Sequence, residues 1–232
     1  RFKDINMRNF LKYILCIVGF LLLRFGVNAQ VTFNTDWIMT DNRYDNYDVD
    51  VYSEVNGNPY LLKDWAKGSV ASGQATLKDQ MLKYDEVANR LFVKGSDGST
   101  KTFKNVISSF TIIDGNKERA FSAGFVSGAD NNNFTFFEVL VNGKLKFLKR
   151  NIKVISVNKE YSGKEVKNVT SEVKYYISRP ESAPVNFKLS ERSILGIFTE
   201  KLAEIKAYIT KNKLNLKVSF NSLIVSVKIL LL

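Results

Sequence analysis

The side chains in this sequence that could do chemistry are its carboxylates, because the chain contains no histidine and a single cysteine, Cys16. The lack of histidine excludes Ser-His-Asp and Cys-His nucleophilic sites and histidine-ligated zinc. Cys16 lies in a segment that we expect to be removed, so the mature chain should have no disulfide, thiolate nucleophile or cysteine-ligated metal. Carboxylate-pair, Ser-Lys and calcium chemistry stay open.

Four of the five aspartates in residues 36–50 are candidates for calcium binding, but their spacing does not fit an EF-hand. That loop needs a central glycine and a distal glutamate, and this segment provides neither. We expect a solvated N-terminal segment and no metal site. The four residues are Asp41, Asp45, Asp48 and Asp50.

Glu138 is the candidate for acid–base chemistry, since it is the acid that falls inside the clearest predicted strand. Hydrolysis of a glycan would need a second carboxyl group beside it. The expected strand register pairs Glu138 with Lys146 instead, which indicates a surface ion pair. We therefore expect no catalytic residues.

Residues 134–150 predict a β-hairpin, because an Asn-Gly pair divides the run FTFFEVLV from KLKFLKR. A two-residue turn would place Glu138 opposite a phenylalanine, whereas a three-residue loop, 141–143, places it opposite Lys146. Cross-strand pairs of matched chemistry stabilise a sheet, so we choose the longer loop, with Gly143 in the left-handed position of a G1 bulge. In this register four apolar residues face the core, namely Phe137, Val139, Leu145 and Phe147.

Short strands separated by turn signals precede this hairpin, so residues 78–150 organise the fold. β-branched and aromatic residues dominate these strands, as a pleated surface prefers. In the strand 106–113 one face is expected to carry Val106, Ser108, Phe110 and Ile112, and the other Ile107, Ser109, Thr111 and Ile113. Besides the hairpin, strands are expected at 51–54, 69–71, 80–84, 91–94, 106–113, 120–126, 152–159 and 173–177, with a charged loop at 160–168.

The C-terminal part changes to a helical period. Ser190 is a suitable N-cap for a helix that ends near residue 198, and Thr199 for a second helix from residue 200 to about 211. Residues 215–232 are an atypical apolar tail, for which a terminal strand and a sequence artefact both stay open. The second helix has one apolar face, made of Leu202, Ile205, Tyr208 and Ile209.

Residues 7–29 predict a secretory signal peptide, with a basic start, an apolar run at 13–23 and Ala29 before the expected cut. The run is shorter than the ~20 residues of a membrane-spanning helix. We expect residues 1–6 to be translated upstream sequence, residues 30–44 to be a flexible segment, and residues 45–214 to form one domain.

Basic residues outnumber acidic ones by 34 to 23, which gives a net charge of +11. Such an excess of basic residues can bind nucleic acid, anionic lipid or acidic polysaccharide, or can simply form a solvated basic surface. Export argues against nucleic acid. The glycines form neither G-x-x-x-x-G-K-[ST] nor G-x-G-x-x-G, so we expect no phosphate loop and no cofactor.

Several local patterns resemble an uncharacterised family of exported proteins from Bacteroidota. The most distinctive is FFEVLVNGK at 136–144, and another is Lys83-Tyr84-Asp85 with Asn89. The resemblance covers most of residues 57–214 and implies export and a β-rich fold with C-terminal helices, but it transfers no active residues. There is also a weaker resemblance: the pattern Tyr84-Asp85 followed by Asn89, Leu91 and Gly95 is similar to the strand repeats of periplasmic lipopolysaccharide-carrying β-jellyrolls.

These features predict an α+β fold that is mainly antiparallel β, as a meander, a sandwich or a partly open barrel. Two short C-terminal helices at about 190–212 and an N-terminal signal helix complete it. We expect a secreted or periplasmic, non-enzymatic envelope protein, a binding or structural module. A carrier of lipid or another amphiphile is the first alternative, and a carboxylate-based glycan hydrolase is the second. The expected partner is envelope lipid, glycan or protein, and not nucleic acid, with no stable transmembrane span after cleavage.

Overall fold

The structure is a computed structural model that describes residues 49–188, 190, 192–193, 196 and 202–211. The chain divides into two units, 1–34 and 35–232, and all the described residues belong to the second. The expected signal peptide, the N-terminal aspartates up to Asp48 and the apolar tail therefore lie outside the described residues.

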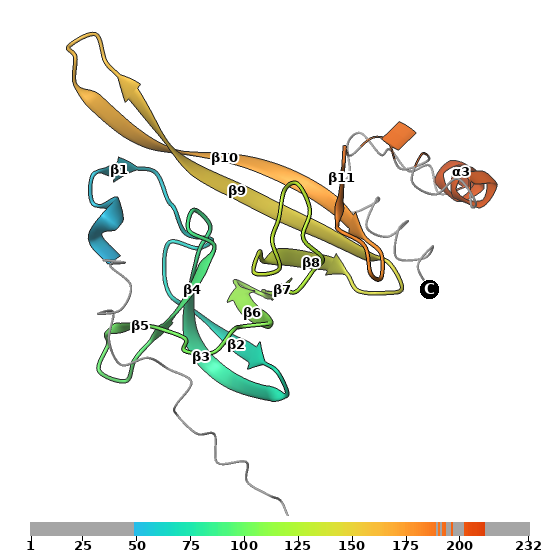
Figure 1. Ribbon diagram of the computed structural model, residues 1–232, viewed down its shortest axis with the longest axis horizontal. Coiled ribbons are helices and arrows are strands. Elements are labelled where there is room, and N and C mark those ends of the chain that lie inside the picture. Colours follow the sequence, from blue (N-terminus) through green and yellow to red (C-terminus); the bar gives the residue numbers. More distant parts are fainter. Residues whose placement is uncertain (1–48, 189, 191, 194–195, 197–201, 212–232) are drawn as a thin grey trace, which may run out of the picture. The chain divides into compact units, whose positions relative to one another are not determined.

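The described residues form one open, mostly antiparallel sheet in the order β1-β10-β9-β8-β7-β6-β2-β3-β4-β5, with β11 paired to β10 (Figure 1). The parallel pair is β1 with β10. The expectation of a mainly antiparallel β fold is therefore confirmed. The strands are β1 (Val55–Asn56), β2 (Ala66–Ser72), β3 (Ala75–Asp85), β4 (Arg90–Lys94), β5 (Thr100–Thr102), β6 (Ser109–Asp114), β7 (Lys117–Ser122), β8 (Phe137–Val141), β9 (Lys146–Lys159), β10 (Glu165–Ser178) and β11 (Val185–Phe187).

Two apolar clusters pack on opposite faces of this sheet. Phe121 lies opposite Glu138 in the β7–β8 pair, so the neighbouring Phe137 points to the other face. The cluster on the Phe121 face consists of Val70, Leu82, Tyr84, Leu91, Val93, Ile107, Phe110, Ile112, Phe121 and Phe136. The cluster on the Phe137 face consists of Phe125, Phe137, Leu148 and Tyr176.

Aromatic rings hold the first cluster together. Phe110 and Phe121 stack with their centroids 4.6 Å apart, and Tyr84 lies 5.1 Å from Phe110. These separations are those of favourable aromatic pairs. Gly68 allows the close approach of β2 and β6, because a Cβ there would clash with the carbonyl oxygen of Thr111.

The β8–β9 hairpin corrects the expected register. β8 ends at Val141 and β9 begins at Lys146, and Glu138 lies opposite Lys149 rather than Lys146. The pairing shifts between Val139 and Val141, which is the geometry of a β-bulge. The longer connection and the bulge replace the expected three-residue loop, and Gly143 has no left-handed φ.

The corrected register also divides the expected apolar cluster between two faces. Val139 lies opposite Leu148 and packs with Phe137, whereas Phe147 is buried on the other face against Phe187. Because side chains alternate along a strand, a shift in register moves residues from one face to the other. Leu145 lies in the connection and is partly buried.

Other expected elements differ at their ends. The segment expected as a strand at 51–54 contains the end of a 3-10 helix, η3 (Val49–Tyr52), and β6 begins at Ser109 rather than residue 106. β10 begins at Glu165, inside the expected charged loop, because it pairs with β9 along its whole length. Long-range pairing of this kind outweighs the local preference of charged residues for loops.

At the C-terminal end, α3 (Leu202–Lys211) lies within the second expected helix. The hydroxyl oxygen of Ser190 accepts a hydrogen bond from the N–H of Ser193 at 3.2 Å, as an N-cap does. Most of the first expected helix, and the side chains of the apolar face of the second, lie outside the described residues. Among the residues that are described, no helix combines the length and apolar character needed to cross a bilayer.

Candidate functional site

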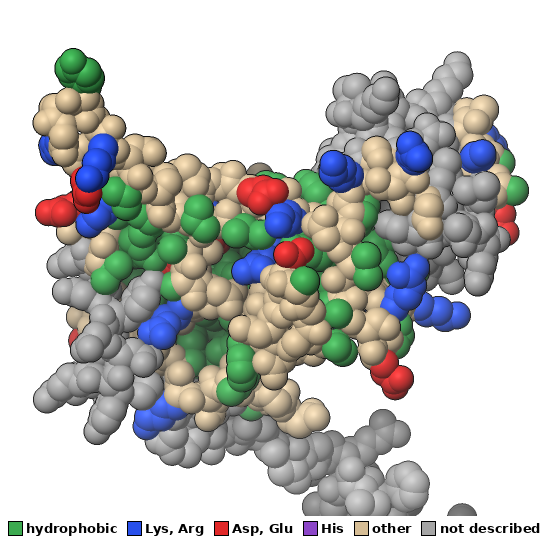
Figure 2. Space-filling view, turned by 45° about the horizontal axis from the view of Figure 1, so that its top comes forward, with side chains coloured by type: hydrophobic (Ala, Val, Ile, Leu, Met, Phe, Trp, Pro, Cys, Tyr) green, Lys and Arg blue, Asp and Glu red, His purple; other side chains and the backbone are tan. Residues whose placement is uncertain are grey.

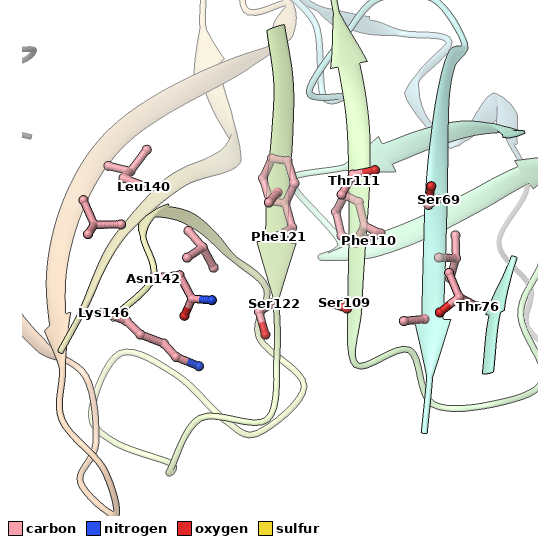
Figure 3. Close-up of a pocket in the computed structure, with 15 residues that line it drawn as sticks. Ser69, Thr76, Ser109, Phe110, Thr111, Phe121, Ser122, Leu140, Asn142 and Lys146 are labelled. Carbon is pink, nitrogen blue, oxygen red and sulfur yellow. The ribbon is translucent and has the colours of Figure 1, made fainter. Parts of the chain in front are cut away.

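A pocket of about 710 Å³ lies on the face of β2, β6 and β7 that is opposite the larger aromatic cluster. Figure 3 shows it bordered by β2 on one side and by β8 and the start of β9 on the other. The described residues that line it are Ser69, Val70, Ala71, Thr76, Ser109, Phe110, Thr111, Ala120, Phe121, Ser122, Val139, Leu140, Val141, Asn142 and Lys146.

The strand register builds the floor of this pocket from small side chains. Ala71, Ser109 and Ser122 form one cross-strand row, and Ser69, Thr111 and Ala120 form the next. Direct cross-strand neighbours point to the same side of a sheet. We call these six residues the hydroxyl face.

Two polar side chains close one side of the pocket. Figure 3 shows Asn142 and Lys146 extending toward β7, where Ser122 lies beside Ser109. Lys146 precedes Leu148 by two residues, so it points to the same face of the sheet as Phe137 and Val139. The Lys146 ammonium nitrogen lies 5.7 Å from the ring centroid of Phe125.

Thr111 contributes a hydroxyl group to the floor of the pocket. Its Oγ1 atom is buried and has no hydrogen-bond partner among the described residues. A buried hydroxyl without a partner is costly, and a bound water or ligand atom relieves that cost. The pocket thus has an unused hydrogen-bonding group in its floor.

Glu138 lies on the opposite face from this pocket, since it is the cross-strand partner of Phe121. Its carboxylate accepts hydrogen bonds from Arg119 Nε at 3.0 Å and Nη2 at 2.8 Å, and from Lys149 Nζ at 3.2 Å. The residue is 5% exposed. The expected surface ion pair with Lys146 is therefore wrong, because the register places Lys146 on the opposite face and Arg119 and Lys149 pair with Glu138 instead.

This environment holds Glu138 ionised. Burial raises the pKa of Glu138, but the hydrogen bonds and charges of Arg119 and Lys149 outweigh it and leave the pKa below its usual range. Burial lowers the pKa of Arg119, but the bonds to Glu138 and Asp114 outweigh it and raise that pKa overall. A carboxylate with a lowered pKa and two cations on its oxygens is poorly suited to donate a proton.

Two further acids, Asp85 and Glu86, are also buried. Asp85 accepts hydrogen bonds from the backbone N–H groups of Val87 at 2.8 Å and Ala88 at 2.9 Å, and from the Tyr52 hydroxyl at 2.8 Å. These contacts fix the β3–β4 turn, so Asp85 has a structural role.

Glu86 forms an ion pair with Lys153 of β9 at 2.9 Å and accepts a hydrogen bond from Asn151 at 2.8 Å. Lys153 also donates to the carbonyl oxygens of Asn58 at 2.9 Å and Tyr60 at 2.6 Å. The network therefore ties β9 to two distant segments of the chain.

The Tyr84-Asp85 pattern with Asn89 is also structural. Burial, followed by the charge of Glu86, raises the pKa of Tyr84 well above its usual range, so its hydroxyl stays neutral. That hydroxyl donates to Asn89 Oδ1 at 2.9 Å, and the Asn89 amide donates to the Phe134 carbonyl at 2.9 Å. The motif joins the β3–β4 turn to the segment before β8.

The described residues contain no group of three or more acids that could hold a metal ion. Figure 2 shows Lys and Arg side chains spread over this face of the molecule rather than gathered over one element. The same view shows hydrophobic side chains at the surface along the β9–β10 hairpin, where Val154 and Val157 are half exposed. Neither feature marks a site as well as the pocket does.

Neither protein-family models, nor curated proteins, nor solved structures match this chain.

Proposed function

We propose that the domain is a non-enzymatic binding module of the cell envelope and that it binds its ligand in the pocket over the hydroxyl face. The proposal includes export by the signal peptide 7–29 and the two C-terminal helices at about 190–212. The observation that carries it is the separation of chemistry between the two faces. The described pocket lining contains no acid, whereas Glu138 is ion-paired on the opposite face.

The pocket is suited to a small ligand. Its volume of about 710 Å³ lies in the range of about 300–1,000 Å³ that is usual for small-molecule sites. Hydroxyl groups in its floor can donate and accept hydrogen bonds. The small side chains of the hydroxyl face leave space that larger residues would fill.

A pocket-filling variant tests this proposal. Ala120 is exposed on β7 at the floor of the pocket, so Ala120→Trp should occupy the pocket without touching the aromatic cluster on the opposite face. Ser171→Trp, at an exposed position of β10, is the matched control. The full chain and both variants would be titrated by NMR with short neutral and acidic sugars and with short-chain amphiphiles.

The expected result is that one ligand class shifts the resonances of the hydroxyl face, that Ala120→Trp removes these shifts, and that Ser171→Trp keeps them. Shifts confined to another surface, or unchanged binding by Ala120→Trp, would overturn the proposal. Catalytic turnover of glycans or peptides by the wild-type chain would also count against a non-enzymatic module.

A carrier of an amphiphile is the second candidate, and one observation favours it. Val139, Leu140 and Val141 give the pocket an apolar side. The floor between β2 and β7 is polar rather than apolar, so the sheet lacks the open apolar face that best suits a carrier. Mass spectrometry of organic extracts from the purified chain separates the two functions, since a carrier should retain a stoichiometric lipid.

A further inference from the structure

One end of the pocket collects hydrogen-bond donors and a positive charge. Lys146 provides an ammonium group, Asn142 an amide, and Ser109 and Ser122 hydroxyls. Figure 3 shows the four side chains around the same part of the pocket. We call these four residues the donor end.

No described acid neutralises this donor end. The residues that line the pocket include no Asp or Glu, and within the described part of the chain no carboxylate is in an ion pair with Lys146. Its cation–π contact with Phe125 leaves the ammonium donors unused, because a ring face accepts charge and not a directed hydrogen bond. The Ser122 hydroxyl has two acceptors, the Ala123 carbonyl at 3.3 Å and the Ser108 carbonyl at 3.5 Å, and a charged acceptor can replace these long bonds.

Lys146 also belongs to a second hollow of about 420 Å³ on the neighbouring surface. Lys144 and Arg179 line that hollow together with one acid, Glu181. Three cations against one carboxylate make the potential positive around the shared lysine. The charge therefore extends beyond the single ammonium group.

We propose that the pocket binds a phosphate monoester, with the phosphate group at the donor end and the organic body on the hydroxyl face. This inference rests on the proposed function, because it assigns a ligand class to the same pocket. A phosphate group presents three acceptor oxygens and a charge of about −1.5 to −2 at neutral pH. The donor end provides an ammonium, an amide and two hydroxyls, which can satisfy all three oxygens.

The organic part of the ester is either a sugar or an alkyl chain, and the experiment uses one phosphate ester of each kind to distinguish them. Glucose 1-phosphate and octyl phosphate would be titrated into the full chain by calorimetry. Methyl glucoside and octanol are their neutral counterparts, and inorganic phosphate measures the anion alone. Lys146→Gln removes the charge, Lys146→Arg keeps it, and Lys164→Gln in the exposed β9–β10 turn is the matched control.

At least one of the two esters should bind at least tenfold more tightly than its neutral counterpart and than inorganic phosphate. Lys146→Gln should lower the affinity for that ester about tenfold, which corresponds to about 1.4 kcal/mol of binding free energy. Lys146→Arg and Lys164→Gln should bind it like the wild type. Unchanged thermal unfolding of Lys146→Gln would show that the loss of binding is not a loss of fold.

Three results would overturn the inference. Binding of each ester no tighter than that of its own neutral counterpart, with Ala120→Trp still blocking all four ligands, would leave the proposed pocket function in place and remove the phosphate assignment. Unchanged ester binding by Lys146→Gln would remove the donor end as the binding group. Binding of inorganic phosphate as tight as that of both esters would show an adventitious ion only.

Discussion

The two faces of β2, β6 and β7 carry opposite kinds of side chain although they share one backbone. On one face Val70, Phe110 and Phe121 are nearly inaccessible to solvent. On the other, the neighbouring Ser69, Ser109 and Ser122 are half-buried and line the pocket. In the proposed function, the first face stabilises the sheet and the second binds the ligand.

Charge follows the same division. The face with the aromatic rings also carries the buried network of Arg119, Glu138 and Lys149, in which each ionised group has an opposite partner. The pocket face carries Lys146 without a described carboxylate partner. Satisfied charges belong to structure, whereas a charge left unsatisfied is available for binding.

Removing a ring from the aromatic face should have the largest effect. Phe110 is 2% exposed and contacts Phe121 and Phe136, so Phe110→Ala should reduce the free energy of unfolding by about 3–5 kcal/mol. Urea denaturation measures this loss. A loss below about 1 kcal/mol would show that the cluster can collapse around the gap, and the stability role of this face would then be wrong.

Breaking the buried ion pair should have the next largest effect. Arg119→Met removes two hydrogen bonds to Glu138 and leaves Lys149 as its cation. Because Lys149 remains as a partner, we expect the free energy of unfolding to fall by about 2 kcal/mol. A fully uncompensated buried charge would lower it by about 3–5 kcal/mol. The double variant Arg119→Met, Glu138→Leu should recover part of this loss. Equal stability of the single variant and the wild type would mean that the pair is not buried in solution.

The pH dependence of stability should identify Glu138 as the group that titrates. Its pKa is lower in the folded protein than in the unfolded chain, because the cations outweigh burial. Its stabilising contribution is therefore complete above the unfolded pKa of about 4.3 and is lost as the pH falls through the lower folded pKa. The difference in unfolding free energy between wild type and Glu138→Gln should shrink as the pH falls from about 6 to about 3.

Glu165→Gln is the control for this measurement, since the ion pair of Glu165 with Lys159 is exposed and 3.7 Å long. Exposed pairs of this kind contribute about 0–1 kcal/mol, so its difference from wild type should stay small at every pH. A Glu138→Gln difference that grows on acidification would have the opposite sign to that of a depressed pKa and would contradict the ion-pair assignment.

The alternation that creates the two faces could be predicted from local sequence. Phe110 and Ile112 are buried and Ser109 and Thr111 point to the other face, as the period of two in this strand predicts. The prediction holds from Ser109 on, where β6 pairs in regular register on both sides. It is wrong for Ile107, which lies before β6 and is buried in the same cluster as Phe110. It needs no knowledge of distant residues.

The partners of Glu138 and the position of Lys146 could not be predicted in this way. They depend on the bulge after Val139 and on a partner far along the chain. A local pairing rule assigned Lys146 to Glu138, but Arg119, 19 residues earlier, is the closer partner. Arg119 of β7 and Lys149 neutralise Glu138, and Lys146 lines the pocket on the opposite face. Because the predicted register of this hairpin was wrong, neither the buried ion-pair network nor the donor end could be predicted.

The smallest effect on stability should come from the pocket face. Ser109→Ala removes a hydroxyl from the floor without opening a cavity, so the free energy of unfolding should change by less than about 0.5 kcal/mol. The same substitution should weaken binding of the phosphate ester, because Ser109 belongs to the donor end. Unfolding and binding measured on one sample therefore separate the two faces at adjacent residues: Phe110→Ala should lose stability, and Ser109→Ala should lose affinity alone. A loss of stability by Ser109→Ala as large as that of Phe110→Ala would mean that both faces are packed core.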